Sequence, residues 1–275
     1  MKKIILVYFV LFVQLTANGQ IIKGKITDEN QNPLAYTNIG IVGLNRGTVS
    51  NNKGIYEIDI SGIENDKIMR ISSVGYESVQ YKIGDLIAHQ TTTLNIELKK
   101  KVFLLSEVVV NSKKVEIIFL GSKKKGKFEW QWSEAIQGAE IGALFKTDYP
   151  VVLERFNFFV KKNFCDSIYY RIRIYDGSNE FPTELINNED IRFMSSLKSG
   201  WESVDLSDFN IKVNSNFIIT LETLDSWTTK KKRMAYLSVR KEYGPSYSKN
   251  SSMAAWIEFS NQMSFRIEAK KYLIE

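Results

Sequence analysis

Residues 22–41 read IKGKITDENQNPLAYTNIGI, and this stretch decides the fold of the first part of the chain. Its opening residues, Ile22 to Ile26, alternate apolar or small residues with lysine, which is typical of a strand buried on one face. The polar run that follows ends in Pro33 and predicts a turn. Thr37 to Ile41 then alternates again. We therefore expect two short strands joined by a tight connection.

The same alternation continues through residues 20–99. Further strands are predicted at Tyr56–Ile60, Lys67–Ser72 and Leu94–Leu98, with turn residues such as Gly54 between them. Many short strands separated by regular turns are typical of a β-sandwich. The predicted fold class is therefore all-β.

Four motifs follow one another in this region: Ile22–Asp28, Pro33–Ile39, Gly47–Tyr56 and Ile71–Glu77. In order and spacing they resemble those of the carboxypeptidase regulatory-like family, which is widespread in Bacteroidetes surface proteins. Asn51 stands where the family usually has Asp, and a neutral amide can fill the same turn role. The resemblance covers about residues 20–99 and implies a transthyretin-like β-sandwich with an architectural role and no catalytic residues of its own.

Residues 1–19 have the three parts of a secretory signal peptide. A positively charged start precedes the apolar stretch Ile4–Val13, and the small residues Ala17 and Gly19 precede a cut before Gln20. The apolar stretch is too short to cross a bilayer as a mature helix; an uncleaved anchor is the alternative. We expect an exported protein of the periplasm, outer membrane or cell surface, with no transmembrane span after cleavage.

The inventory of reactive side chains argues against catalysis. The single cysteine, Cys165, excludes an internal disulfide, and the single histidine, His89, excludes a metal site built from several histidines. No Gly-x-Ser-x-Gly elbow is present. Carboxylate pairs such as Glu222 and Asp225 remain, but closeness in sequence does not set a general acid/base separation. We predict no enzyme activity, no cofactor and no metal. With 37 Lys and Arg against 31 Asp and Glu, the charge excess does not indicate nucleic-acid binding.

A lysine-rich stretch divides the chain. We interpret residues 100–127 as a linker between a first domain, residues 20–99, and a second, residues 128–275. Within the linker, Leu104–Val110 resembles the L-x-E-V-V-V segment that follows this domain in TonB-dependent receptors. It predicts either a strand that adds to a partner's sheet edge or a final strand or connector of the sandwich.

The second region also has the pattern of strands. In Ser167–Tyr175 one face is apolar and the other is cationic and aromatic, through Arg171 and Arg173. The region resembles the jelly-roll-like C-terminal domain of related proteins, which implies a second β-sandwich. The segments that carry this resemblance are Arg171–Tyr175, Phe181–Ile186 and Gly200–Ile211. Other predicted strands are Val152–Phe159, Phe217–Leu224, Met234–Val239, Ala254–Phe259 and Met263–Tyr272.

Exposed tryptophans and a basic cluster are the candidate ligand-binding residues. Trp227 lies in a polar, loop-like stretch, and Trp130 and Trp132 share a face if their segment is extended. The alternatives are that these rings pack the core and that the cluster is a solvated hairpin tip. We predict a non-catalytic binding or structural module of the cell envelope whose partner is a glycan or an envelope protein. The second hypothesis is an accessory component of TonB-dependent uptake, with an outer-membrane receptor as partner. The basic cluster is Lys230, Lys231, Lys232 and Arg233.

Overall fold

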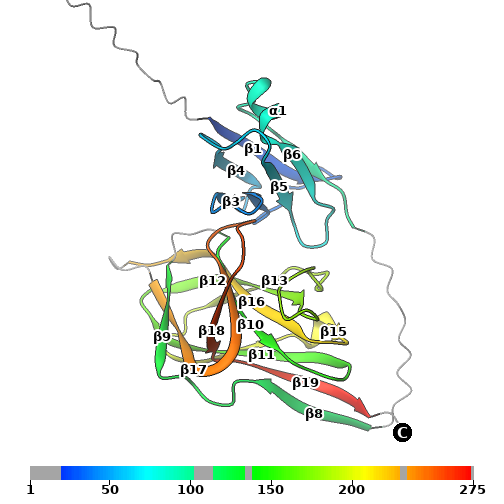
Figure 1. Ribbon diagram of the computed structural model, residues 1–275, viewed down its shortest axis with the longest axis vertical. Coiled ribbons are helices and arrows are strands. Elements are labelled where there is room, and N and C mark those ends of the chain that lie inside the picture. The colour runs from blue at the N-terminus through cyan, green and yellow to red at the C-terminus, as the bar shows by residue number, and fades with distance from the viewer. Residues whose placement is uncertain (1–19, 102–113, 134–137, 230–233, 274–275) are drawn as a thin grey trace, which may run out of the picture.

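The computed structural model describes residues 20–101, 114–133, 138–229 and 234–273 of the 275-residue chain. They form two bodies, the first running from blue to cyan and the second from green to red (Figure 1). Nearly all regular structure is strand, and the one α-helix described is the short α1 (Ile83–Ala88). The all-β prediction is confirmed.

Two small sheets make up the first domain. The alternating isoleucines of the opening stretch face inward, and Ile22 and Ile26 of one sheet meet Ile39 and Ile41 of the other in a fully buried core. One sheet has the order β4 (Ile55–Asp59), β1 (Ile21–Asp28), β7 (Ile96–Leu98), and the other the order β3 (Gly47–Val49), β2 (Asn38–Ile41), β5 (Ile68–Ser72), β6 (Val79–Lys82).

The turn chemistry expected at Asn51 is present. Its Oδ1 accepts hydrogen bonds from the backbone N–H groups of Lys53, at 2.9 Å, and Ile55, at 3.0 Å. The following Gly54 has a φ of +74°. A Cβ there would lie 2.5 Å from the carbonyl oxygen of Ile26, so glycine is required on two counts.

One curved sheet forms the second domain. Its long strand β17 pairs with β11 near its start and with β10 near its end, so it carries the hydrogen-bonding pattern from one half of the sheet to the other. The strands are β8 (Lys114–Gly121), β9 (Phe128–Ser133), β10 (Glu140–Phe145), β11 (Val151–Asn163), β12 (Ser167–Asp176), β13 (Ile191–Ser195), β14 (Gly200–Asp205), β15 (Lys212–Val213), β16 (Phe217–Trp227), β17 (Met234–Lys249), β18 (Ile257–Met263) and β19 (Phe265–Leu273), with the 3-10 turn η1 (Ser207–Phe209).

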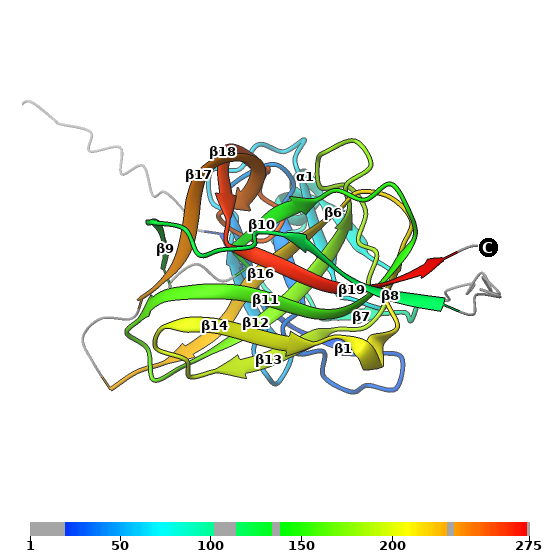
Figure 2. The ribbon, with the colours of Figure 1, turned by 90° about the horizontal axis from the view of Figure 1, so that it is seen from below.

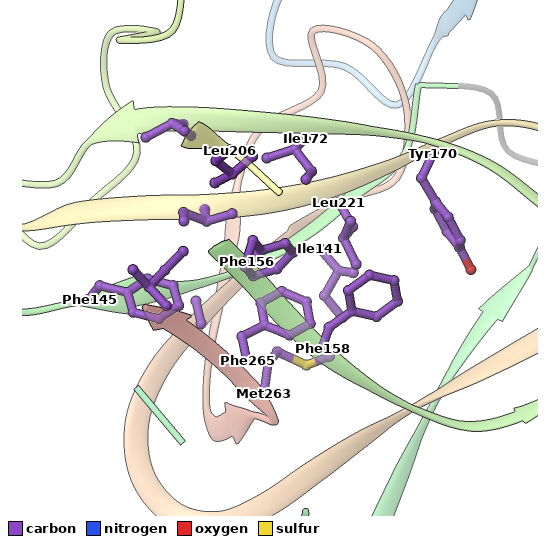
Figure 3. Packing of buried hydrophobic residues seen from close by; sticks show 14 of the residues in the cluster. Ile141, Phe145, Phe156, Phe158, Tyr170, Ile172, Leu206, Leu221, Met263 and Phe265 are labelled. Atoms are coloured by element: carbon purple, nitrogen blue, oxygen red, sulfur yellow. The ribbon is translucent and has the colours of Figure 1, made fainter. Parts of the chain in front are cut away.

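The two halves of this sheet close over the larger apolar core of the domain. Ile172 and Leu221 from one half approach Phe156, Phe158 and Phe265 from the other (Figure 3). The rings of Phe156 and Phe265 meet edge to face, with their centroids 5.1 Å apart. Edge-to-face contact is favourable beyond simple burial because the positive ring edge meets the negative ring face. The result is a sandwich-like half-barrel; the narrower jelly-roll assignment stays a prediction.

Several strands, among them β8 and β10, differ from the sequence-based expectation. β8 lies inside residues 100–127, the stretch interpreted as a linker, and pairs along its length with β19. β10 was not predicted because all six of its residues are buried, so no alternation marks it. It lies between β16 and β17 at the centre of the sheet.

Phe158 and Phe119 provide a matched test of this core. Phe158 is fully buried, whereas Phe119 on the edge strand β8 is 56% exposed. We expect Phe158→Ala to lower the free energy of unfolding by about 3–5 kcal/mol, because it leaves a cavity among aromatic rings. Phe119→Ala should cost less than about 1 kcal/mol. Urea denaturation of both variants measures the difference, and equal losses would contradict this description of the core.

Candidate functional site at the domain junction

The register of the second domain places four charged residues in one row. Arg171 pairs with Glu222, Glu222 with Glu140, and Glu140 with Lys249, across the adjacent strands β12, β16, β10 and β17. Directly opposed side chains on one face of a sheet lie within contact distance. Along the row the charges are therefore cation, anion, anion and cation. We call it, together with Arg173 on the same face of β12, the charged row.

The charged row is buried. Glu222 and Glu140 are 0% and 1% exposed, and Arg171 is 1% exposed. Sequence alternation predicted a cationic face for β12, and the structure places that face beneath the first domain instead of in solvent. Buried ions are tolerated only when they are paired and hydrogen-bonded.

Each carboxylate of the row is paired with cations. The Glu222 carboxylate accepts hydrogen bonds from Arg171 Nη1 at 3.1 Å and from Arg173 Nε at 3.0 Å. Glu140 lies 2.7 Å from the Lys249 ammonium and 3.5 Å from Arg173 Nε. The Glu140 carboxylate also accepts from the Tyr175 hydroxyl at 2.9 Å.

The first domain completes the row through Asn38, at the start of β2. The Asn38 amide donates to Glu222 Oε1 and to Ser252 Oγ, both at 2.8 Å. Its carbonyl oxygen accepts from both arginines, at 3.1 Å from Arg171 Nη1. One amide therefore matches a carboxylate on one side and two guanidinium groups on the other.

Arg171 binds both domains at once. Its Nη2 donates to the backbone oxygen of Tyr36, at 2.7 Å, in the first domain. Its Nε and Nη2 also donate to the two oxygens of Asp190, at 2.6 and 3.0 Å. This forked pairing of guanidinium with carboxylate gives strong and oriented hydrogen bonds.

Beside the charged row, the backbone of the first domain closely approaches that of the second. A Cβ on Gly40 would lie 2.1 Å from the Ser252 carbonyl oxygen, and one on Gly47 would lie 2.3 Å from it. The Gly43 N–H donates to the Met253 oxygen at 2.9 Å. The connection between β17 and β18 thus reaches up to the first domain (Figure 1). Two glycines of β2 and β3 allow that approach.

The charges around Glu222 shift the pKa of its carboxyl. Burial alone would raise the pKa of its carboxyl, but the charges of Arg173 and Arg171 and the amide of Asn38 outweigh burial and lower that pKa to about 2. Burial likewise tends to lower the pKa of Lys249, but Glu140 raises it above the ordinary value. Glu222 and Lys249 are therefore both ionised at neutral pH.

This arrangement suits a structural role, in which paired charges hold the two domains together. Its carboxylates hold cations and amides and are closed to solvent, so they are unsuited to proton transfer with a substrate. Within the described ranges, no group of three or more His, Cys, Asp or Glu side chains is placed to hold a metal ion. No helix in the described part of the chain has the length and apolar character needed to span a bilayer.

The predicted binding residues lie elsewhere, in the second domain. Trp227 is 42% exposed at the end of β16. Trp130 is half-buried and stacked on Phe259, with centroids 4.4 Å apart, so it packs against the core as its alternative reading had it. Trp132 lies in the strand β9, so the segment is extended, but its side chain is outside the described residues. So are Lys230, Lys231, Lys232 and Arg233.

The sequence analysis named Arg171, Arg173 and Glu222, but it did not predict that they meet at a domain junction. The available signals were Asn38, inside the motif of residues 33–39, and the two arginines in the RIRIY segment of β12. Alternation marks these arginines as sharing a face, but it does not say whether that face meets water or another domain.

Comparison with known proteins finds a family similarity in the first part of the chain. The family model of the CarboxypepD_reg-like domain matches residues 22–110. The resemblance seen in the motifs is thereby supported, and the match runs past residue 99 through residue 110. The comparisons indicate no catalytic family, and no curated protein matches the chain.

Similarities to solved structures are distant. The infectious bursal disease virus Gx strain matches with a TM-score of 0.30 and 9% identity, over 85% of this chain and 62% of the viral one. The VP2 subviral particle of that virus matches with a TM-score of 0.25 and 9% identity, over 92% and 64% of the chains. The major pilin subunit of Bacillus cereus gives a TM-score of 0.20 and 9% identity, over 88% and 68%. This chain thus spans less than two thirds of the viral chains, and such scores define no shared fold.

Replacement of Glu222 tests the charged row. Its contribution to stability is complete above its ordinary pKa of 4.5 and is lost as the pH falls toward 2, because the folded-state pKa is the lower one. Glu222→Gln removes the carboxylate that two buried arginines share and leaves Arg171 paired with Asp190 and Arg173 with Glu140. We therefore expect a loss of about 3 kcal/mol at pH 7. Below pH 4.5 the variant should lose further stability less steeply than the unmodified protein.

Chemical denaturation between pH 7 and pH 2.5 measures both effects. Glu57→Gln is the matched control, because the Glu57 side chain is 55% exposed and pairs with Lys23 at the surface; it should cost less than about 1 kcal/mol. Parallel pH profiles for Glu222→Gln and the unmodified protein would show that the row does not hold its charge as described.

Proposed function

We propose that this chain is an exported, non-catalytic module of a Gram-negative cell envelope that binds a glycan or an envelope protein. The observation that carries the proposal is the junction, where buried and mutually paired charges join a CarboxypepD_reg-like domain to the second domain. The site holds side chains in place and offers a substrate no free reactive group. In this proposal the first domain positions the second, and the second domain makes the binding contacts.

The end of the second domain around Trp227 supports a binding role. The Asp166 N–H donates to the Trp227 oxygen at 2.8 Å, and the Lys198 ammonium reaches the oxygens of Cys165 and Asp166. An exposed indole is therefore carried by a hydrogen-bonded strand end, and a lysine ammonium binds the neighbouring backbone of Cys165 and Asp166. A rigid aromatic ring with polar neighbours is the usual anchor of a ligand or protein contact.

The export part of the proposal rests on residues 1–19, with their positive start, apolar stretch and small residues before Gln20. These residues lie outside the described part of the chain. Periplasm, outer membrane and cell surface are the addresses that a cleaved signal allows.

A glycan array tests the binding role. The mature protein should bind a subset of glycans in the presence of calcium, and Trp227→Ala should weaken that binding at least tenfold because it removes the exposed ring. Ile257→Ala is the control, since Ile257 is an equally exposed apolar residue, at 53%, on β18. A blank array would exclude the glycan form of the proposal and leave an envelope protein as the partner to be sought by cross-linking.

A second candidate function is accessory participation in TonB-dependent uptake. The observation that favours it is the extent of the family match, which includes the Leu104–Val110 segment. The segment itself lies outside the described residues. Its backbone groups could pair with the sheet edge of an outer-membrane receptor.

Exchange of Leu104–Val110 for a glycine–serine segment of equal length tests this candidate. We expect a TonB-dependent receptor to co-purify with the unmodified protein and to be lost with the exchanged one. Equal recovery of the receptor with both proteins would remove the basis for the idea. The exchange keeps the spacing between the domains, so a loss would report the segment's own contacts.

A further inference from the structure

A second feature of the chain is the loop of residues 122–127, between β8 and β9. It contains the run Lys123-Lys124-Lys125-Gly126-Lys127, which the sequence suggested was a solvated linker. In the structure, hydrogen bonds from Gly126 to two serines of the sheet hold this loop in place.

Gly126 anchors the loop through a buried hydroxyl pair. Its N–H donates to Ser238 Oγ at 2.8 Å and to Ser264 Oγ at 2.9 Å, and Ser238 Oγ donates back to the Gly126 oxygen at 3.0 Å. A Cβ at this position would lie 1.9 Å from the Val239 oxygen, so only glycine fits. Ser122 holds the other side of the loop, because its Oγ donates to the Lys124 oxygen at 2.8 Å.

The anchored loop forms one wall of a cavity of about 290 Å³. Lys125, Lys127 and Lys161 line it together with Phe159, Gly126 and Ser199. The Lys125 ammonium lies 5.3 Å from the centre of the Phe159 ring, and Lys161 donates to the Lys127 oxygen. Three lysines and one aromatic ring thus line the same cavity.

These three lysines carry no counter-ion among the described residues. None of the salt bridges of the described chain includes Lys125, Lys127 or Lys161, whereas the neighbouring Lys162 pairs with Glu129 at 3.2 Å. Three like charges at a partly enclosed site attract an anion and raise its local concentration.

Aromatic rings extend the site across the outer face of the sheet. Phe159 meets Trp201 edge to face at 5.4 Å, the Arg266 guanidinium lies 5.0 Å from the Trp201 ring, and it lies 5.7 Å from the ring of Phe119. The strands that carry these residues, β11, β14, β19 and β8, run side by side on the face turned away from the first domain (Figure 2).

We propose that this cavity binds an anionic group, phosphate or carboxylate, of a saccharide, with the three lysines as the charge contacts and the Phe159–Trp201 pair as the ring contact. The inference rests on the proposed binding function and gives its ligand class. Ammonium groups bind phosphate and carboxylate as point charges. Phe159 is half-buried at the cavity wall, which suits contact with a ligand ring better than insertion into a bilayer.

Isothermal titration calorimetry with matched saccharides tests the inference. The probes are a phosphorylated oligosaccharide, a uronate oligosaccharide and a neutral oligosaccharide of the same length. We expect at least one charged probe to bind tenfold or more tightly than the neutral one, with an affinity that falls as salt is raised, because exposed charges are screened.

Paired variants locate the binding. Lys125→Gln with Lys127→Gln should weaken the charged probe at least tenfold, whereas Lys125→Arg with Lys127→Arg should retain most of the affinity. The control is Lys53→Gln with Lys82→Gln, two exposed lysines of the first domain, and it should change the affinity less than twofold. Circular dichroism confirms that each variant is folded.

Several results would overturn the inference. Equal binding of charged and neutral probes, or no effect of the loop variant, would reject the anionic site while leaving glycan binding itself in place. No binding of any saccharide would reject both the site and the glycan form of the proposed function. Tighter, lysine-dependent binding of duplex DNA or of phosphatidylglycerol vesicles would show that the cavity serves another polyanion.

Discussion

The pairing of Glu222 with Arg171 and Arg173 is the interaction on which the two-domain arrangement depends. A carboxylate removed from water is strongly destabilising unless cations and hydrogen-bond donors replace the lost solvent. Here the second domain supplies the cations and the first supplies the amide of Asn38. Removal of the first domain would uncover this network. The charges therefore specify where the domains meet, which is the best-attested role of buried ionic groups.

Alternation in the sequence predicted the first domain well because its sheets are short, antiparallel for the most part and buried on one face. Alternation did not predict the parts of the sheet that are buried on both faces. β10 lacks any period because both of its faces are covered, and the Arg171–Arg173 face of β12 has the pattern of a solvent-exposed face although a domain covers it. A local pattern records that neighbours differ in polarity, and it does not record what lies opposite them.

The candidate sites follow the same rule. The exposure of Trp227 could be predicted because its flanking residues are polar, and the extended form of β9 could be predicted from its aromatic content. The fixed position of the loop at residues 122–127 could not be predicted. Its anchors, Ser238 and Ser264, lie more than one hundred residues away and have ordinary sequence surroundings. Contacts of that range join separate strands only after the sheet has formed.

The central claim is that the charged junction makes the two domains one rigid body. Residual dipolar couplings of the backbone amides test it most directly, because they report the orientation of each domain against a common axis. A single alignment tensor should fit the couplings of residues 21–101, 140–229 and 234–270 together. Two tensors of clearly different magnitude would show that the domains move independently and would contradict it.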